Sequence, residues 1–310
     1  MIYTITFNPS LDLNLTIDDL KISHTNRAKT EELLLGGKGI NVSTVLKNLG
    51  MDNTAIFYAA GFTGDEIEKR VHDFGIKSEC IKLEDGLSRI NVKIKNIDGT
   101  EINGLGPNIP SEKVDELLEK LKKLKDGDVL ILAGSIPSSM PNTIYSDILN
   151  IVSAKDIKVV VDATGELLLN TLKYEPFLIK PNKNELEEIF EVTLKDKESI
   201  ISYAKKLKDI GARNVLISMA GDGALLVAND YKVYESEAPA GKVINAVGAG
   251  DSMVAGFVAG CMNDEGILLD DIDYKYAFRL GLSAGSASAF SSDLATKEEI
   301  INLYKKTYEK

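Results

Sequence analysis

The chain has 310 residues, enough for one large domain or two ordinary ones, and 44% of them are hydrophobic, as in a globular protein. Its formal net charge of −11 argues against a general nucleic-acid-binding protein. No apolar run is long enough to span a membrane, no signal segment leads the chain, and Cys80 and Cys261 match no metal or redox spacing, so we expect a soluble, cytoplasmic protein without membrane partners.

Short apolar segments alternate with amphipathic segments along most of the chain. Strands are predicted over 2–7, 54–60, 129–132, 158–161, 177–179 and 214–218, and helices over 64–74, 111–124, 142–152, 184–190 and 200–209. Strands rich in Val, Ile and Leu are typical of a parallel sheet with helices on both faces. The pattern predicts a doubly wound α/β fold, in which ligands bind beyond the carboxyl ends of the strands. A later hairpin over 224–235 and a Gly-, Ala- and Ser-rich helix over 277–290 complete it.

Two segments break this alternation and predict a small separate sheet. Strands are expected over 11–17, 28–35, 87–95 and 100–103, and Asp98 and Gly99 predict the hairpin turn between the last two. Leucines at 11, 13 and 15 alternate with polar residues, so one face of that strand should be buried and the other solvated. We interpret 11–35 and 87–104 as a four-stranded lid on a single domain spanning 1–310, and this lid could also join two copies as a homodimer.

The segment 245–256, with the sequence NAVGAGDSMVAG, carries the strongest chemical signal. Gly248, Ala249 and Gly250 precede Asp251, and an apolar helical pattern follows them. A helix that starts near Ala249 would direct its first N–H groups at an anion. Asp251 in the first turn could then accept a proton from a group that attacks the anion, which favours phosphoryl transfer. The alternative is a strand–turn–helix corner in which Asp251 only caps the helix.

A second glycine cluster, Gly36 to Gly39 with Lys38 inside it, opens another helical pattern that contains Asn41. Its N–H groups and Lys38 could hold a sugar hydroxyl or a phosphate, although it is not a P-loop because the G-x-x-x-x-G-K-[ST] spacing is absent. Asp12 follows the first strand and could accept two sugar hydroxyls. The alternatives are an ordinary glycine-rich corner and a turn aspartate that bonds its own backbone.

Polar residues follow two later strands. Asn182 and Glu185 lie three apart at a helix start, where they could hold water and Mg²⁺ near phosphates or simply form a capping pair. Asp162 is another acid at the end of a strand. Ser218, Gly221 and Gly223 would suit a loop under a nucleotide.

These motifs together resemble the ribokinase-like (PfkB) carbohydrate kinases. Gly36–Gly39 and Gly248–Asp251 are similar to the two signatures of that family, and 182–185 matches its N-x-x-E motif. The resemblance extends over essentially the whole chain and includes the lid. The segments 8–12 and 39–42 look like the branch that acts on phosphorylated ketohexoses. The segment 88–94, followed by 101–104, looks most like the members of that branch that act on fructose 1-phosphate.

The resemblance implies that fructose 1-phosphate is phosphorylated by ATP at its C6 hydroxyl. Tagatose 6-phosphate and fructose 6-phosphate are the alternative substrates. Two rival functions lie outside this reaction: a non-catalytic sensor of sugar phosphates and a nucleoside kinase. An intact acid at Asp251 speaks against the sensor, because a binding module needs no base. Basic residues near the lid favour a phosphorylated sugar over a nucleoside.

The resemblance also implies a role for each matched position. Asp251 is the expected base, and Gly248, Ala249 and Gly250 the expected anion hole. The implied substrate contacts are Asp12, Gly37, Lys38 and Asn41 for the sugar, and Arg89 and Arg27 for its phosphate. The implied nucleotide contacts are Lys180, Asn182, Ser218, Gly221, Gly223, Gly285 and Ser286, and Glu185 is the implied Mg²⁺ ligand, through water. The family's monovalent-cation loop is matched only loosely by Asn245, Val247, Ser288 and Ser291, which argues against dependence on K⁺.

Overall fold

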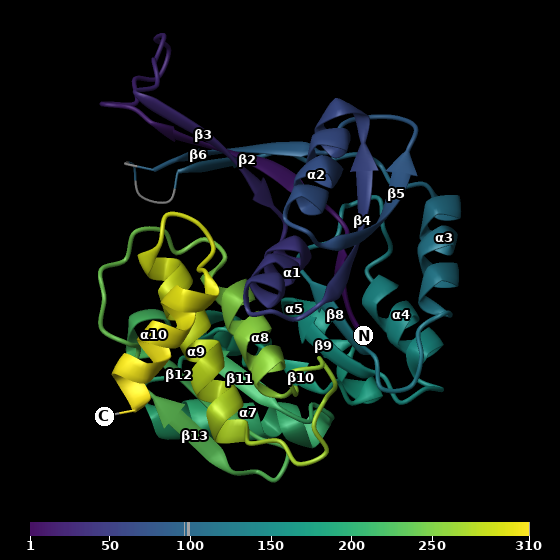
Figure 1. The fold of residues 1–310 in the computed structure, drawn as a ribbon, viewed down its shortest axis with the longest axis vertical. Coiled ribbons are helices and arrows are strands. Elements are labelled where there is room, and N and C mark those ends of the chain that lie inside the picture. The colour runs from purple at the N-terminus through teal and green to yellow at the C-terminus, as the bar shows by residue number, and fades with distance from the viewer. Residues whose placement is uncertain (96, 98–99, 310) are drawn as a thin grey trace.

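A nine-stranded sheet forms the centre of the protein (Figure 1). The computed structural model describes residues 1–95, 97 and 100–309. The strand order is β13-β12-β11-β10-β9-β8-β1-β4-β5, and all neighbours are parallel except in the hairpins β11-β12 and β12-β13. The strands are β1 (Ile2–Thr6), β4 (Asn53–Ala60), β5 (Lys77–Leu83), β8 (Val129–Ala133), β9 (Lys158–Asp162), β10 (Leu178–Ile179), β11 (Val215–Ser218), β12 (Ala224–Val227) and β13 (Val233–Ser236).

Helices cover both faces of this sheet, which confirms the predicted fold class. One face carries α1 (Lys38–Asn48), α2 (Gly61–Asp73), α8 (Ala249–Gly260), α9 (Tyr274–Phe290) and α10 (Lys297–Tyr308). The other carries α3 (Ser111–Leu121), α4 (Ile144–Val152), α5 (Gly165–Leu169), α6 (Lys183–Phe190) and α7 (Lys197–Ile210).

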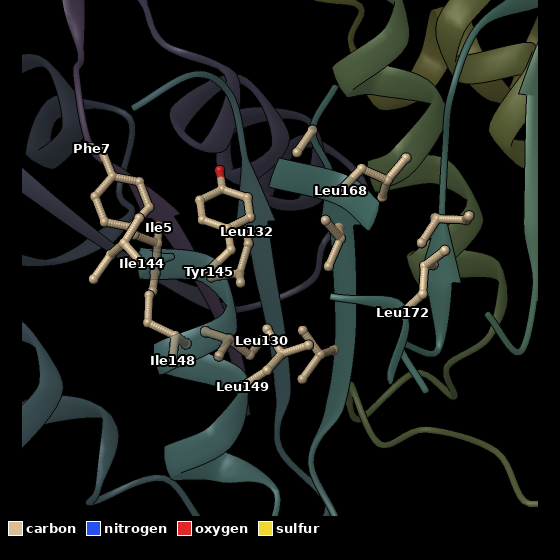
Figure 2. Packing of buried hydrophobic residues seen from close by; sticks show 14 of the residues in the cluster. Ile5, Phe7, Leu130, Leu132, Ile144, Tyr145, Ile148, Leu149, Leu168 and Leu172 are labelled. Atoms are coloured by element: carbon tan, nitrogen blue, oxygen red, sulfur yellow. The ribbon is translucent and has the colours of Figure 1, made fainter. Parts of the chain in front are cut away.

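Alternate strand residues enter the two cores. Leu130 and Leu132 of β8 pack under α4 (Figure 2), whereas Val129 and Ile131 enter the opposite core, which α1, α8 and α9 cover. Because both faces are covered, β8 is apolar at every position, as the sequence pattern predicted.

A second sheet of four strands projects from the body as the predicted lid (Figure 1). Its order is β3-β2-β6-β7, with β2 (Ser10–Thr16), β3 (Thr30–Gly36), β6 (Arg89–Ile94) and β7 (Glu101–Asn103). Strand β2 pairs antiparallel with β3 and parallel with β6. The turn predicted at Asp98 and Gly99 lies outside the described residues.

The two faces of the lid are not buried in the way that a simple alternation suggests. The polar residues Asp12 and Asn14 are 7% and 6% exposed, because their face is turned toward the body. Apolar residues of the opposite face are more open: Leu33, Ile90 and Ile102 are 36%, 41% and 66% exposed. Within one chain the apolar face therefore remains partly uncovered.

Three elements were not predicted from the sequence: β5, α5 and α10. Other boundaries differ by up to three residues; α2 begins at Gly61 rather than 64, and α9 at Tyr274 rather than 277. None of the helices in the described part of the chain combines the length and hydrophobicity that a membrane span requires. That the chain is a single domain stays a prediction.

Candidate active site

Four charged side chains meet at the carboxyl ends of β9 and β10, beside the first turns of α1 and α8. Asp162 is the last residue of β9. Its Oδ2 atom lies 3.3 Å from Lys38 Nζ, and its Oδ1 atom lies 3.3 Å from Lys180 Nζ. Asp162, Lys180 and Asp251 are only 2%, 6% and 5% exposed. The fold thus assembles this cluster from four separate segments of the chain.

The two lysines hold Asp162 in its charged form. Burial acts to raise the pKa of Asp162, but the positive charges of Lys180 and Lys38 outweigh it and keep that pKa below its usual value. Burial acts to lower the pKa of Lys38, but Asp162 and Asp251 outweigh it and keep that pKa above its usual value. The cluster therefore offers two ammonium groups to an incoming anion.

Asp251 has the opposite environment. Its Oδ2 accepts a hydrogen bond of 2.8 Å from Asn41 Nδ2, which leaves Oδ1 available. Burial, followed by the negative charge of Asp162, raises the pKa of Asp251 to about 6, although Lys38, Asn41 and Lys180 act against this rise. A carboxylate with a pKa just below neutrality suits a general base.

The first turn of α8 faces the same cluster. Gly248 precedes the helix with φ = 80°, a left-handed conformation that glycine adopts without steric cost. A Cβ on Gly250 would lie 3.2 Å from Lys180 Nζ, so this backbone passes close to the lysine. Ala249 N–H donates to Ala246 O at 3.3 Å, whereas the Gly250 amide has no hydrogen-bond partner in the described part of the chain. The Gly248 amide likewise has none among the described residues, so two of the three predicted anion-hole amides are free to bind a ligand.

Asp12 lies on the polar face of the lid, within a set of donors from two lid strands. Its Oδ1 accepts hydrogen bonds from Ser10 Oγ at 2.7 Å and Asn91 Nδ2 at 2.8 Å. Its Oδ2 lies 2.6 Å from Lys93 Nζ. Asn91 and Lys93 were not among the predicted site residues. They lie two and four positions after Arg89 on one strand, so the two-residue period of a strand would have assigned all three to one face.

Arg89 and Lys38 line a cavity of about 410 Å³ with Asp162, Ser135 and Asn8. Arg89 is half-buried, and its Nε donates to Asn8 O at 3.0 Å. Two residues that line the cavity each carry a buried oxygen atom, Asn8 Oδ1 and Thr6 Oγ1, that has no hydrogen-bond partner within the described residues. This volume and these polar groups suit a small phosphorylated ligand.

Of the two remaining predicted substrate contacts, Gly37 lies at the start of α1 and Arg27 lies on the lid. Gly37 ends the turn before α1 with φ = 115°, and a Cβ there would lie 2.8 Å from Thr6 Cγ2, so only glycine fits. Arg27 lies in the exposed connection between β2 and β3, at the far end of the lid (Figure 1). The structure does not bring Arg27 to the cluster within one chain.

The predicted magnesium ligand is part of a helix cap. Glu185 N–H donates to Asn182 Oδ1 at 2.9 Å, and Asn182 N–H donates to Glu185 Oε2 at 2.8 Å. This capping box begins α6, as the structural alternative in the sequence analysis proposed. Among the described residues, no group of three or more His, Cys, Asp or Glu side chains is arranged to hold a metal ion.

The other predicted nucleotide contacts fall into two groups. Ser218 is bridged to Asn182, and Gly221 lines an open cavity of about 370 Å³ beyond β11. Gly223 and Gly285 instead allow close packing of the backbone. A Cβ on Gly223 would lie 2.1 Å from Ser236 O, and a Cβ on Gly285 would lie 2.9 Å from Ala249 O. The neighbouring Ser286 is half-buried.

Comparison with known proteins defines the class. The pfkB family of carbohydrate kinases matches residues 8–300, and the chain belongs to that family. It is therefore a kinase that uses ATP, as the motifs predicted. Its matched segment includes the lid, the lysine cluster and α8.

Individual relatives are similar over nearly the whole chain. A 1-phosphofructokinase of Bacillus subtilis (strain 168) is 43% identical over 303 residues, which are 98% of this chain and 97% of the relative. A D-tagatose-1-phosphate kinase of Bacillus licheniformis is 37% identical, over 95% of this chain and 94% of that protein. The crystal structure of phosphofructokinase-2 from Escherichia coli in complex with fructose-6-phosphate is 26% identical, with a TM-score of 0.87 over 99% of this chain and 98% of that one.

Proposed function

We propose that this kinase transfers the γ-phosphoryl group of ATP to the C6 hydroxyl of fructose 1-phosphate, which gives fructose 1,6-bisphosphate and ADP. The observation that carries the proposal is Asp251, which is buried at the start of α8, hydrogen-bonded by Asn41 and close to the charges of Lys38 and Lys180. The 43% identity to a 1-phosphofructokinase supports the choice of substrate.

In this mechanism Asp251 Oδ1 accepts the proton of the C6 hydroxyl while that oxygen attacks the γ-phosphorus in line. The bond from the γ-phosphorus to the bridging oxygen breaks, and ADP leaves. Lys38 and Lys180 offset the negative charge of the transition state, together with the Gly250 amide and the positive end of the α8 dipole. The lid covers the sugar and excludes water, which limits hydrolysis of ATP.

Mg²⁺ fits this site as an ion held mainly by phosphate oxygens and water, which is its usual habit in kinases. The carboxylates on hand are oxygen donors, but Asp162 is engaged by two lysines and Glu185 Oε2 by the Asn182 amide. We propose Glu185 as a ligand through water. When bound, the ion would neutralise charge on the phosphates.

On the sugar side, we propose that Asp12 accepts hydrogen bonds from sugar hydroxyls, near Gly37 and Asn41. Arg89 would bind the 1-phosphate with a two-pronged guanidinium, in the cavity that also contains Ser135. The predicted roles of Arg27, Asn182, Ser218, Gly221, Gly223, Gly285 and Ser286 stay part of the proposal.

D-tagatose 1-phosphate is the second candidate substrate, because a kinase named for it is 37% identical to this chain. This sugar also carries a 1-phosphate and differs from fructose 1-phosphate only in the configuration of one hydroxyl. Asp12 and its neighbours would have to make this distinction.

The assembly and location follow from the same features. We propose that the open apolar face of the lid, with Leu33, Ile90 and Ile102, covers the same face of a second copy. A homodimer would remove this exposed surface from water. We also propose that the enzyme acts in the cytoplasm, where ATP is available.

Turnover with Mg·ATP on a panel of ketohexoses tests the function. The panel contains fructose 1-phosphate, tagatose 1-phosphate, fructose 6-phosphate, tagatose 6-phosphate and unphosphorylated fructose. We expect the highest kcat/KM with fructose 1-phosphate. Preference for a 6-phosphate would contradict the substrate and the use of Arg89. Tight binding without turnover would favour a sensor instead.

A further inference from the structure

Lys93 is a nearly buried lysine of the lid to which neither the proposed reaction nor the sequence motifs assign a role. It lies on β6, and its side chain is 13% exposed. Its Nζ contacts Asp12 Oδ2 at 2.6 Å, and the Asp12 side chain is 11% exposed. Water therefore screens this ion pair far less than a surface pair.

The Lys93–Asp12 pair is part of a larger built network. Asn91 donates to Asp12 Oδ1 and accepts from the Gly104 amide at 3.2 Å, which ties the carboxylate to the loop after β7. A Cβ on Gly36 would lie 2.7 Å from Asp12 Oδ1, so the glycine of β3 leaves room for the carboxylate. Three neighbouring strands thus contribute to the orientation of one side chain.

The count of hydrogen bonds shows what the network leaves open. A carboxylate offers about four acceptor positions on its two oxygens. Ser10, Asn91 and Lys93 occupy three of them, so about one remains for a sugar hydroxyl without displacing a partner. Without Lys93, a carboxylate this deeply buried would lose the one ion-pair partner that it has among the described residues and would turn away.

We propose that Lys93 is a positioning residue that keeps the Asp12 carboxylate directed at the hydroxyls of the sugar. This inference rests on the proposed function, in which Asp12 binds the sugar. Lys93 then acts through Asp12 and not through its own contact with substrate. Its removal should weaken sugar binding and leave ATP binding unchanged.

The chain offers a matched control on the same lid. Lys95 also forms an ion pair with a carboxylate, Nζ to Glu32 Oε2 at 2.8 Å, but this pair is exposed at the edge of the lid. Lys95→Met removes a lid lysine and its ion pair without touching Asp12. Any effect common to both lysine variants comes from the lid as a whole.

Isothermal titration calorimetry of fructose 1-phosphate and, separately, of ATP would test the inference on the full-length protein. We expect Lys93→Met to raise the Kd for the sugar phosphate at least about tenfold, because one partner of a buried charge pair is lost. The Kd for ATP should stay within about twofold, and Lys95→Met should resemble the wild type. Lys93→Arg should restore most of the affinity, because it keeps the charge and a donor.

A double-mutant cycle with Asp12→Asn separates positioning from direct contact. If Lys93 acts through Asp12, Lys93→Met should cost little in the Asp12→Asn background. An equal loss in both backgrounds would overturn the inference, as would an unchanged sugar Kd or a parallel loss of ATP affinity. Lys93→Gln replaces Lys93→Met in the cycle if the latter does not fold.

Failure of the proposed function has a different signature. If the wild type prefers another ketohexose phosphate, the substrate assignment fails, and the same cycle with that sugar still decides the role of Lys93. If the wild type binds fructose 1-phosphate and Lys93→Met binds it equally well, the function stands and the inference fails.

Discussion

Two buried aspartates in the crevice carry opposite pKa shifts, although they belong to one cluster. Asp162 contacts two lysines and stays ionised, whereas Asn41 is the one hydrogen-bond partner of the Asp251 side chain among the described residues. The environment thus separates a structural anion from a group that can exchange a proton near neutral pH. This difference yields two predictions at the level of single residues.

The first prediction concerns the pH dependence of turnover. Asp251 must be ionised to accept a proton, and its pKa in the free protein is raised to about 6. We expect kcat/KM to fall about tenfold for each pH unit below that value and to level off above it. Initial rates at low sugar concentration between pH 5 and 8 would measure this.

The variant Asn41→Leu controls for ionisation of the substrate phosphate, which also titrates near pH 6. The hydrogen bond from Asn41 lowers the pKa of Asp251, so its loss should move the acid limb to higher pH. A limb that stays in place would assign the titration to the substrate and not to Asp251.

The second prediction is that Asp251→Asn loses activity and gains stability. Loss of the base should lower kcat by at least about 10²-fold. The Asp251 carboxyl binds its proton more tightly in the folded chain than in the unfolded chain, because folding raises its pKa to about 6. The protonated side chain therefore stabilises the fold below about pH 4, and this stabilisation is lost as the pH rises through about 6. Removing the charge should therefore raise the free energy of unfolding at pH 8, by on the order of 1–3 kcal/mol.

Chemical denaturation at pH 8 and at pH 4.5 would measure the difference in the free energy of unfolding between the Asp251→Asn variant and the wild type. This difference should be smaller at the lower pH. Asp52→Asn, at an exposed aspartate, is the control and should change neither activity nor stability measurably. Near-normal turnover of the Asp251→Asn protein would remove Asp251 from the role of base.

Among the elements, the pair α8 and α9 shows how the site is held in place. The two helices approach so closely that a Cβ on Gly256 would lie 2.7 Å from Ala284 Cβ and 2.8 Å from Leu280 O. At the start of α8, Gly285 leaves similar room for Ala249 O. Small residues along this contact therefore fix the position of the helix that carries Asp251.

The third prediction tests this packing. Gly256→Val should lower the free energy of unfolding by about 1–3 kcal/mol, because the added methyl groups have no space. Thermal or urea unfolding would measure the loss. Gly221→Val is the control, since a Cβ there meets nothing within 4 Å. Equal stability of the two variants would mean that the helices separate easily.

Local patterns in the sequence were sufficient for the elements whose burial is uniform. The strands β1, β4 and β8 are buried at nearly every position and mostly apolar, and the glycines before α1 and α8 mark the starts of those helices. Strand β5 escaped prediction because, at the sheet edge, it mixes exposed lysines with half-buried Glu79 and Cys80. Residues that pair with such a strand, and not its own sequence, decide its conformation.

The site was predictable residue by residue but not as a set of contacts. The two glycine motifs led to Lys38 and Asp251, and the strand ends led to Asp12 and Asp162. Nothing local indicated that Asp162 lies between Lys38 and Lys180, because Lys38 and Asp162 are 124 residues apart in the chain. The partners of Asp12 were missed for the same reason, since strand pairing brings Lys93 beside it.

At the scale of the whole molecule, the lid has two faces with different surroundings. One face carries Asp12 and Lys93 toward the body, and the other leaves Ile90 and Ile102 open to solvent. A single sheet would thus form part of the proposed sugar site and, in the proposed homodimer, part of the subunit contact.

The fourth prediction concerns that contact. Light scattering after size exclusion should give about twice the 33.7 kDa mass of one chain for the wild type. Replacing Ile90 and Ile102 together by Asp should yield monomers, because charges would be buried at the contact. Ile267→Asp, at an exposed site outside the lid, should leave the mass unchanged. A monomeric wild type would contradict the proposed homodimer.

The alternation of the lid strands also limits how this protein can change in length. Deleting one residue within β2 or β6 would shift every following side chain to the opposite face. Leucines would then point into the sugar site, and Asp12 or Lys93 would point to solvent. The exposed connection between β2 and β3 carries no such alternation, so insertions and deletions should accumulate there while the strands vary only by substitution.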